Sequence, residues 1–525
     1  MFQFNLHAKN GSADDQESIC HSTVTIGRGP LGPQSKVYLL SVANGPRTLA
    51  WEAGGVTLSI SNRKYLARLA VLAVLVTACG DGGGAVTTGA DTGTTMADTG
   101  TTAADTGTTA AGTGTTGGTA AGNVVFWTSA TNPVDIAGME KIVAAFNELG
   151  GPTAELVQVT GAETEATQLI TAVRGGTGPD VYMLDRFTVA QRAADGLLED
   201  LTQFDPDPLA GYIDFAAEEA TFDGKAYALP FDTDTRALYY NIDILEEVGI
   251  DPAELDPANG PITWDRAMEI ANEMTIEEGG NYTRMGFVPW QTWSNGQGWH
   301  YTFGFSWEAD FYDESGCQVT PDSPENLAAF QWVYDTAAAL DVEMTSAFVA
   351  ADQPNDLPPE QQHFYQGNVG MLISGDWLIA GLAQYAPDMN YGITYLPVPE
   401  EGVESSTWAG GWSMVIPEGA QNPEGAWEFL NYIAGEEGQR VYVVDTAHLP
   451  TWEALSEEEG LLDERHAFFG SLLPQAENRP PLPVGALYWD ELTTAFQATY
   501  LNQTQPAEAL ASVKERTQAQ LDQFC

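Results

Sequence analysis

In the first part of the folded chain, apolar positions switch between the two periods of regular secondary structure. Short strand-like runs occupy residues 124–127, 156–159 and 180–184. Between them, apolar side chains recur at helical spacing over 139–149 and 169–173, and a pair of glycines follows each of these two stretches. This strand–helix–strand–helix–strand order predicts an α/β fold, with a parallel sheet covered by helices.

Three residues with binding chemistry follow these predicted strands. Trp127 ends the first strand, and Asp185 and Arg186 follow the third. Because ligands of open parallel sheets bind beyond the carboxyl ends of the strands, we expect all three side chains near a ligand site. Two simpler roles compete with this one: a helix N-cap for Asp185 and a surface ion pair for Arg186.

The stretch 225–241 changes its pattern twice. Alternating residues at 225–229 predict a strand, which Pro230 ends because proline has no N–H group to donate to a neighbouring strand. A polar segment follows, and an apolar run at 237–240 then leads into a helical pattern that Asn241 opens. We interpret this stretch as a connection that leaves one lobe, crosses a cleft and begins a second lobe.

Aromatic residues are concentrated between Trp290 and Trp307, among glycines and asparagines. Their spacing does not follow a helix, so a cleft wall explains them better than a core stripe. Flat sugar faces pack on aromatic rings, while carboxylates and amides bind the hydroxyl groups. For any single ring, core packing is an equal alternative. Trp293 is the first candidate for ligand contact in this group.

The chain before residue 123 has a different character. Residues 1–55 show no sustained period, and either a start codon assigned too early or a disordered extension explains them. Residues 56–79 have the layout of an export signal, with basic residues before an apolar core at 69–76 that is too short to span a bilayer. Residues 80–122 contain a degenerate seven-residue repeat without large apolar side chains, which predicts a flexible tether and no coiled coil.

The predicted export signal ends in Leu75-Val-Thr-Ala-Cys79. This ending resembles the lipobox of bacterial lipoproteins, in which the cysteine is lipid-modified and becomes the new N-terminus. The resemblance implies that Cys79 anchors the protein to the cell membrane from outside the cytoplasm. An ordinary signal peptide with an incidental cysteine is the alternative.

Composition excludes several classes of function. The chain has 525 residues and a formal net charge of -53, whereas nucleic acids and anionic membrane surfaces require clustered Lys and Arg. A surface this acidic favours solubility and charge repulsion. The common zinc, phosphate-loop and serine-hydrolase signatures are absent, and the four cysteines lack metal-binding spacing. We therefore expect neither a metal nor a cofactor.

Several segments resemble extracellular solute-binding proteins of the maltose- and sugar-binding type, which deliver ligands to ABC importers. The stretch 225–241 resembles the first crossing between their lobes. The segment 174–187, Arg-Gly-Gly-Thr-Gly-Pro-Asp-Val-Tyr-Met-Leu-Asp-Arg-Phe, resembles the part that ends in a sugar-binding Asp-Arg pair. This resemblance implies that Asp185 and Arg186 bind sugar hydroxyl groups.

The similarity continues toward the C-terminus. Residues 369–377 resemble a strand and turn whose tryptophan, here Trp377, lies against the ligand; Asp376 beside it has no clear role. Residues 408–417 and 448–451 resemble the second and third crossings, and 422–433, Asn-Pro-Glu-Gly-Ala-Trp-Glu-Phe-Leu-Asn-Tyr-Ile, resembles a helix of this family with Asn422 as N-cap. Near the C-terminus, the resemblance implies a cleft aromatic at Tyr488 or Trp489, and sometimes an arginine, Arg479.

The resemblance implies a two-lobed fold of the periplasmic-binding-protein type (type II), with the ligand cleft between hinge-linked lobes. We expect residues 123–232 and 412–446 in the first lobe, and 233–411 and 447–525 in the second. Trp127, Asp185 and Arg186 would bind from the first lobe, Trp293, Trp377 and Trp489 from the second, and Asp232 and Trp412 from the hinge. Cys317 and Cys525 fall in one predicted lobe outside the cytoplasm, where two thiols tend to pair, so we expect a disulfide.

The implied function is capture of a carbohydrate by hinge closure and its delivery to the transmembrane subunits of an ABC permease. We expect a monomer that is not an enzyme and that meets the membrane only through its lipid. The alternatives are a secreted carbohydrate-active enzyme and a receptor for another solute, such as a peptide, a polyamine or iron. Acidic residues are so numerous that a pair such as Asp313 and Glu314 does not indicate catalysis.

Overall fold

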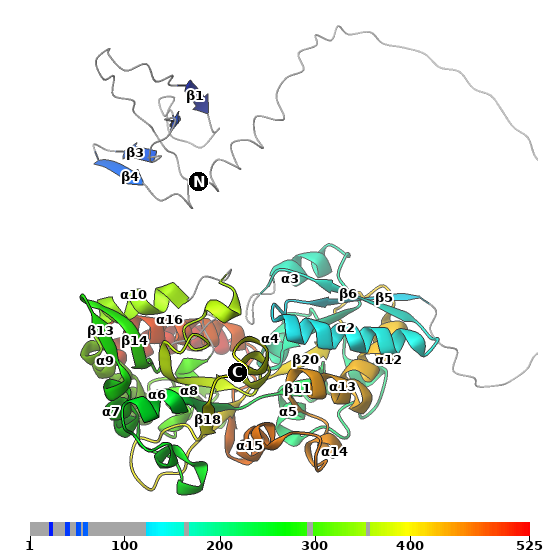
Figure 1. Cartoon of the computed structure of the whole chain (residues 1–525). Coiled ribbons are helices and arrows are strands. Elements are labelled where there is room, and N and C mark those ends of the chain that lie inside the picture. Colours follow the sequence, from blue (N-terminus) through cyan, green and yellow to red (C-terminus); the bar gives the residue numbers. More distant parts are fainter. Residues whose placement is uncertain are drawn as a thin grey trace, which may run out of the picture. The chain divides into compact units, whose positions relative to one another are not determined.

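The structure is a computed structural model of the chain. It describes residues 20–24, 37–41, 49–53, 56–60, 122–161, 167–290, 298–352 and 357–525. The chain forms two compact units, Met1–Gly112 and Thr113–Cys525 (Figure 1). The expected ligand residues all belong to the second unit.

The described residues of the unit Met1–Gly112 form two small antiparallel sheets. Their strands are β1 (Cys20–Val24) with β2 (Val37–Ser41), and β3 (Leu49–Ala53) with β4 (Val56–Ile60). The sequence pattern assigned no strand to residues 1–55, and β4 occupies the expected start of the signal peptide. The apolar segment of that signal, Cys79 and the expected tether up to residue 121 lie outside the described residues.

A five-stranded sheet in the order β10-β20-β7-β5-β6 forms the first lobe of the larger unit. Its strands are β5 (Asn123–Thr128), β6 (Thr153–Gln158), β7 (Val181–Asp185), β10 (Leu229–Pro230) and β20 (Trp412–Val415). β5 runs parallel to both β6 and β7, as the pattern predicts, whereas β20 is antiparallel to its two neighbours. The chain thus returns to this sheet late in the sequence.

Helices cover both faces of this sheet (Figure 1). α2 (Pro133–Glu148), α12 (Pro423–Ala434) and α13 (Glu436–Thr446) share one apolar core with β5, and α3 (Thr167–Arg174) packs in another core with β7. α12 begins as predicted, with Pro423 as its first residue and the Asn422 side chain accepting a hydrogen bond from the Gly425 N–H.

The second lobe is built on a mixed sheet in the order β13-β14-β17-β12-β18. Its strands are β12 (Arg236–Asn241), β13 (Ile276–Glu278), β14 (Asn281–Phe287), β17 (Val369–Gly375) and β18 (Tyr391–Thr394). β12 pairs antiparallel with both β17 and β18, and β14 runs parallel to β17. Both lobes therefore combine a sheet with helices, which is the expected α/β architecture.

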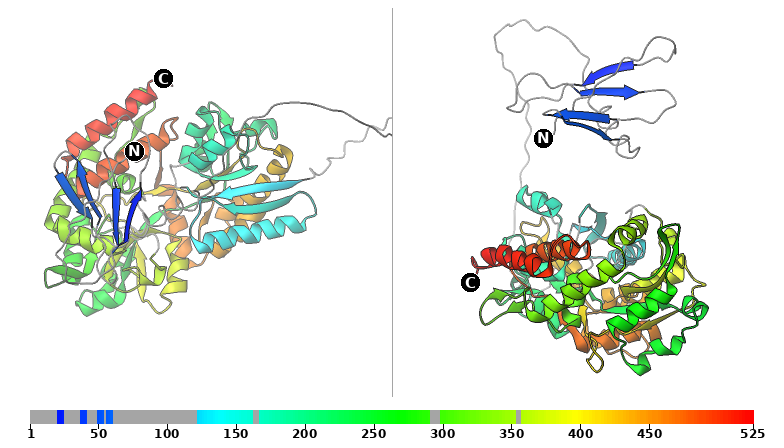
Figure 2. Two further views of the ribbon diagram at one scale, coloured as in Figure 1. Left: turned by 90° about the horizontal axis from the view of Figure 1, so that it is seen from above. Right: turned by 90° about the vertical axis from the view of Figure 1, so that its left-hand side faces the viewer.

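The helices of the second lobe pack in one large core with this sheet. The longer ones are α7 (Trp264–Met274), α9 (Pro324–Ala339), α10 (Val342–Asp352), α16 (Gly485–Tyr500) and α17 (Pro506–Leu521). α17 packs against α16 and α9, and Figure 2 shows it in red along the second lobe. Besides α3 and α8, the shorter helices among the described residues of the larger unit are α4 (Val189–Ala194), α5 (Asp214–Glu219), α6 (Ile242–Glu247), α11 (Leu378–Tyr385), α14 (Glu453–Ser456) and α15 (Glu464–Leu472).

The aromatic-rich stretch differs from the expected cleft wall. Residues Trp299–Ser306 form α8, and every residue of this helix is buried. Its rings pack into the second-lobe core, for example Phe303 against Trp264 with centroids 4.8 Å apart. The prediction that this spacing is not helical was wrong, because a helix buried on all sides has no polar face to reveal its period. Trp293 lies outside the described residues.

Three chain segments connect the lobes side by side. β11 (Asp232–Thr233) pairs antiparallel with β21 (Leu449–Pro450), and Asp234 forms a bridge with Gly410. We call these three segments, residues 230–236, 409–412 and 446–451, the crossing segments. The third segment is followed by Trp452, which packs on the first-lobe core, so contact with this lobe extends past the expected boundary at residue 447.

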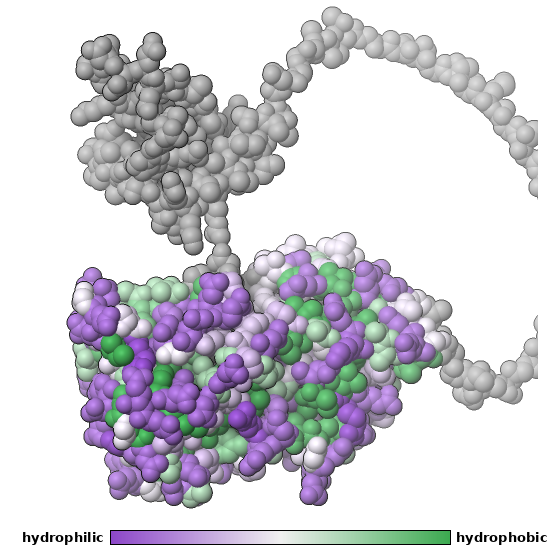
Figure 3. Space-filling model, in the orientation of Figure 1, coloured by the Kyte–Doolittle hydropathy of each residue, from purple (hydrophilic) through white to green (hydrophobic). Residues whose placement is uncertain are grey.

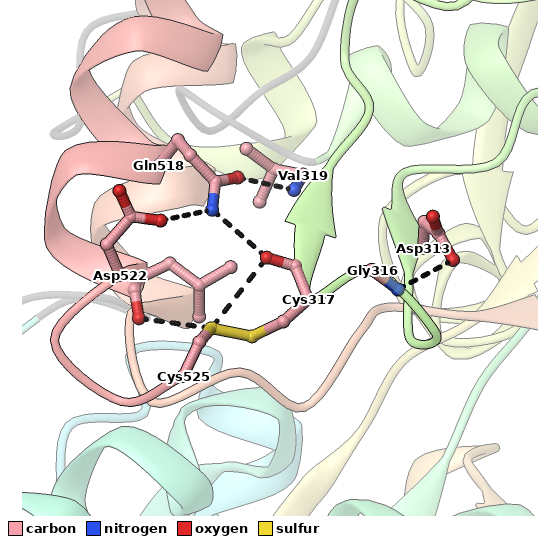
Figure 4. Close-up of a disulfide and its surroundings, with 8 residues drawn as sticks. Asp313, Gly316, Cys317, Val319, Gln518, Asp522 and Cys525 are labelled. Carbon is pink, nitrogen blue, oxygen red and sulfur yellow. Dashed lines mark hydrogen bonds between the residues drawn. A yellow bond between two sulfur atoms is a disulfide. The ribbon is translucent and has the colours of Figure 1, made fainter.

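A disulfide joins Cys317 to Cys525, the pairing expected from the sequence. It connects α17 to the turn between β15 (Tyr312–Asp313) and β16 (Gln318–Val319). The Gln518 side chain adds two hydrogen bonds there, accepting from the Val319 N–H and donating to the Cys317 carbonyl (Figure 4). The C-terminal helix is thus fastened to the second lobe.

The visible surface of the larger unit mixes hydrophilic areas with smaller hydrophobic ones (Figure 3). Among the described residues, large apolar side chains are strongly exposed at Leu149, Val444 and Phe524. None of the helices within the described ranges is both long and apolar enough to cross a membrane.

Candidate functional site

Apart from Trp127, the expected ligand residues that the structure describes lie at or near the crossing segments. On the first-lobe side, β5 and β7 end at Thr128 and Asp185. On the second-lobe side, β12 begins at Arg236, the last residue of the first crossing segment. Another strand pair connects this region to the C-terminal part, where β19 (Thr407–Ala409) runs parallel to β22 (Ala476–Asn478).

Trp127 is half-buried and borders a hollow of about 490 Å³ in the first lobe. The other residues of this hollow are Thr160, Thr167, Gln168, Thr171, Ala172 and Thr177. An indole ring beside hydroxyl and amide groups is the combination that a sugar needs. The hollow is lined from β5, the end of β6 and α3, so it belongs to one lobe only.

Asp185 is buried and forms an ion pair with Arg479, whose guanidinium nitrogen lies 2.9 Å from a carboxylate oxygen. Burial raises the pKa of the Asp185 carboxyl, and Arg479 acts in the opposite direction. The competing role as a helix cap is not seen, because the side chain makes no capping hydrogen bond to the turn that follows. Ligand contact by Asp185 stays a prediction, since its carboxylate already has a partner.

Arg186 is completely buried, so it is not the surface ion pair that was the alternative. Its Nε atom lies 2.6 Å from a Glu219 oxygen. Its other guanidinium nitrogens donate to the carbonyls of Asp232 and Gly410. Arg186 therefore joins the first lobe to two crossing segments, and direct sugar binding by this side chain stays a prediction.

Asp232 and Trp412 contact each other between two crossing segments. The Trp412 N–H donates to an Asp232 oxygen at 2.7 Å. Burial raises the pKa of the Asp232 carboxyl to about 7, although the nearby His448 and this hydrogen bond oppose the shift. The Trp412 ring is half-buried and packs on the first-lobe core.

Trp377 is half-buried at the start of α11 in the second lobe, and a buried arginine lies next to it. The Arg236 guanidinium carbon is 5.1 Å from the Trp377 ring centroid and 3.4 Å from that of Trp408. Arg236 is also ion-paired with Asp234. The sequence reasoning did not single out Arg236 or Asp234, since a polar crossing has no pattern that shows which of its side chains turn inward.

Trp489 is buried and packs across the meeting point of the lobes. Its ring stacks on Phe187, which follows β7, with centroids 5.0 Å apart. His300 and Trp408 contact it edge-on at 4.9 and 6.1 Å. The implied cleft aromatic is thus enclosed by protein groups, and Tyr488, the other candidate, donates its hydroxyl to the Phe311 carbonyl inside the second lobe.

His448 in the third crossing segment is a further buried group at this junction, which the sequence reasoning missed. It lies between acidic side chains of the first lobe and of the crossing segments, Asp135 and Asp232. A single histidine carries no recognisable pattern, so only the fold brings these groups together. Within the described ranges, no three His, Cys, Asp or Glu side chains are arranged to hold a metal ion.

Comparison with known proteins matches residues 130–440 to the family described as bacterial extracellular solute-binding protein. The chain belongs to this family. The matched range covers most of both lobes and all but the last of the crossing segments.

Individual relatives agree with this assignment. A binding protein of Brucella abortus is 25% identical over 360 residues, which cover 67% of this chain and 82% of that protein. The arabinooligosaccharide-binding protein of Halalkalibacterium halodurans is 24% identical over 345 residues, covering 63% of this chain and 72% of that protein. The solved structure of CpMnBP1 with mannobiose bound superposes with a TM-score of 0.66 at 21% identity, covering 75% of this chain and 99% of that chain. The fold is therefore the expected two-lobed type II fold of solute-binding proteins.

Proposed function

We propose that this solute-binding protein captures a carbohydrate between its lobes and delivers it to the transmembrane subunits of an ABC importer. A lipid on Cys79 holds it at the outer face of the cell membrane. It acts as a monomer and needs no cofactor. Because its task is binding, no covalent bond of the ligand is formed or broken.

The observation that carries this proposal is the presence of half-buried indoles in the first lobe, in the second lobe and in a crossing segment. Trp127 belongs to the first lobe, Trp377 to the second, and Trp412 to a crossing segment. Rings from both lobes allow a ligand to favour closure, since a ligand shifts the equilibrium only through contacts that differ between the open and closed forms. Trp293, Trp489, Asp185, Arg186 and Asp232 are the further expected contacts.

The relatives support a carbohydrate as the ligand class. One is named for arabinooligosaccharides, another, from Bacillus subtilis, for galactooligosaccharides, and the superposed structure holds mannobiose. They differ in their sugars, so we propose the class and not one sugar. Peptides and polyamines are the alternative solutes that the test must include.

Thermal-shift screening of the full chain against mono- and oligosaccharides tests the proposal, since a ligand that binds only the folded protein raises its unfolding midpoint. We expect at least one oligosaccharide to raise the midpoint and to be recovered unchanged after incubation. Trp377→Ala should abolish the shift. Trp427→Ala is the matched control, because Trp427 is also half-buried but stacks on Phe204 within the first lobe. A shift with peptides or polyamines alone, or hydrolysis of the sugar, would refute the proposal.

A further inference from the structure

The His448 ring lies between one aromatic ring from each lobe. Tyr442 of α13 stacks on it with centroids 5.4 Å apart and ring planes at 12°. Trp377 of the second lobe lies against it at 6.2 Å and 29°. Tyr442 belongs to the first-lobe core, whereas the residues that follow Trp377 belong to the second-lobe core. One histidine thus contacts both lobes.

Both ring nitrogens of His448 face carboxylates. Nε2 lies 3.5 Å from an Asp135 oxygen, and Nδ1 lies 3.7 Å from an Asp232 oxygen. Asp135 is in the first turn of α2 in the first lobe, and Asp232 is in the first crossing segment. His448 itself is 5% exposed, so water screens these attractions weakly.

Several helices and strands that surround His448 each contribute an ionisable side chain near its ring. These side chains are Asp135 of α2, Asp232 of β11, Asp376 after β17, Tyr442 of α13 and His466 of α15. Asp376, on the second-lobe side, is fully buried; burial raises the pKa of its carboxyl well above the ordinary value, and the nearby His448 opposes this shift. Burial by itself lowers the pKa of His448, but Asp232, Asp135 and Asp376 outweigh it and raise this pKa to about 10. A charged imidazolium is the form that this surrounding stabilises.

We propose that protonated His448 is an interlobe clamp, a positioning residue that favours the observed arrangement of the two lobes. It attracts α2 of the first lobe through Asp135 and the second lobe through Asp376 and the Trp377 ring. These contacts are available together only when the lobes are arranged as observed. The part of the inference that concerns ligand affinity rests on the proposed function: a protein held near its binding-competent arrangement binds more tightly.

The clamp can be tested without any sugar by measuring the distance between the lobes. Glu148 of the first lobe and Glu277 of the second lobe are both exposed, so each can be replaced by an unnatural amino acid that carries a ketone. A spin label attached to the ketone does not react with the cysteines of the full chain. Pulsed electron resonance then gives the distance distribution. We expect His448→Gln to shift part of the population to longer distances at pH 7. In the wild type, the same shift should appear as the pH rises through about 10, whereas His448→Gln should show no such response.

Two further variants keep the test decisive. Asp135→Asn retains the histidine but removes its first-lobe partner, and it should shift the distances in the same direction even if His448→Gln does not fold. His466→Gln is the control, because His466 pairs with Asp463 at 2.7 Å and does not lie between the Tyr442 and Trp377 rings. This variant should give the distances and the pH response of the wild type. If His448→Gln and Asp135→Asn both keep the wild-type distances and pH response, the clamp is refuted.

Calorimetry with the sugar found by the screen separates this inference from the proposed function. If His448 acts as the clamp, its replacement in His448→Gln should weaken sugar binding by about 5- to 50-fold relative to the wild type. This is within the usual range of coupling between a ligand and a conformational equilibrium. If no sugar binds the wild type, the proposed function fails and the distance measurement still decides on the clamp. If His448→Gln and the wild type bind the sugar equally well and show the same distances between the lobes, the clamp is refuted and the proposed function stands.

Discussion

The Asp185 carboxylate and the Arg479 guanidinium, 2.9 Å apart, form a buried ion pair between the end of a first-lobe strand and the segment after β22. Arg479 also lies over the Phe187 ring, with its guanidinium carbon 4.2 Å from the ring centroid. Asp185 was expected to contact ligand, and Arg479 was implied only as an arginine that is sometimes near the cleft. Their pairing holds the end of β7 and the segment after β22 together, and ligand contact by Asp185 stays a prediction.

Removing one partner of this pair should be costly, because the other charge is left buried without compensation. We expect Arg479→Met to lower the free energy of unfolding by about 3–5 kcal/mol. Arg516→Met is the matched control: Arg516 pairs with Glu491 at 2.7 Å but is 54% exposed, so its loss should cost at most about 1 kcal/mol. Urea denaturation gives both values. Equal losses in the two variants would contradict the structural role of the pair.

Gly375 determines where the Trp377 ring lies. A Cβ atom at Gly375 would be 2.0 Å from ring atom Cζ3 of Trp377, so alanine must displace the indole. We expect Gly375→Ala to weaken sugar binding by roughly tenfold or more. The displaced Trp377 ring would lose its contact with the sugar, which is worth up to about 1.5 kcal/mol, together with some packing. Gly470→Ala is the control, because its nearest neighbours would be 4.0 Å away. Calorimetric titration measures both affinities, and wild-type binding by Gly375→Ala would contradict the assigned role of Trp377.

The disulfide should stabilise the second lobe without affecting ligand binding. It closes a loop between residues 208 positions apart, and such cross-links stabilise proteins mainly by restricting the unfolded chain. We expect Cys525→Ser to lower the free energy of unfolding by about 2–4 kcal/mol. Sugar affinity should stay as in the wild type, because the bond fastens α17 to the β15–β16 turn. An unchanged denaturation midpoint after reduction would count against this role.

Acid should destabilise the protein partly through His300. This side chain is 1% exposed, and burial together with the nearby Arg479 lowers its pKa from 6.5 to about 3. Because this pKa is lower in the folded state than in the unfolded state, the contribution of neutral His300 to the free energy of unfolding is fully present above pH 6.5. This contribution is lost as the pH falls toward 3. We expect His300→Phe to lose less stability than the wild type between pH 7 and pH 4. Denaturant titrations at each pH show this difference, and parallel curves for the two proteins would exclude it.

Local patterns sufficed for the elements that depend on neighbouring residues. The parallel strands β5, β6 and β7 follow from short strand-like runs between helical faces. The start of α12 follows from Asn422 and Pro423, because a cap and a first-turn proline act within a few residues. The first crossing was also visible, since Pro230 ends one strand just before the next lobe begins.

Long-range contacts were beyond the sequence pattern. Arg186 meets Glu219, and His448 meets Asp135, only after distant segments fold together. The same holds for Trp489, whose stacking on Phe187 encloses a ring that was expected to face the ligand. The sequence thus showed some of the chemical groups at the junction, such as Asp185, Arg186 and Asp232, and the fold decided which groups each of them meets.

If the two lobes close on a carbohydrate between half-buried indoles, isothermal titration of the full chain with arabino-, galacto- and manno-oligosaccharides will show saturable binding of at least one of these sugars. We expect one site per chain, with binding lost in Trp377→Ala and kept in Trp427→Ala. Absence of binding by all three classes of sugar, or binding that survives Trp377→Ala unchanged, would show that the lobes do not bind a carbohydrate in this way.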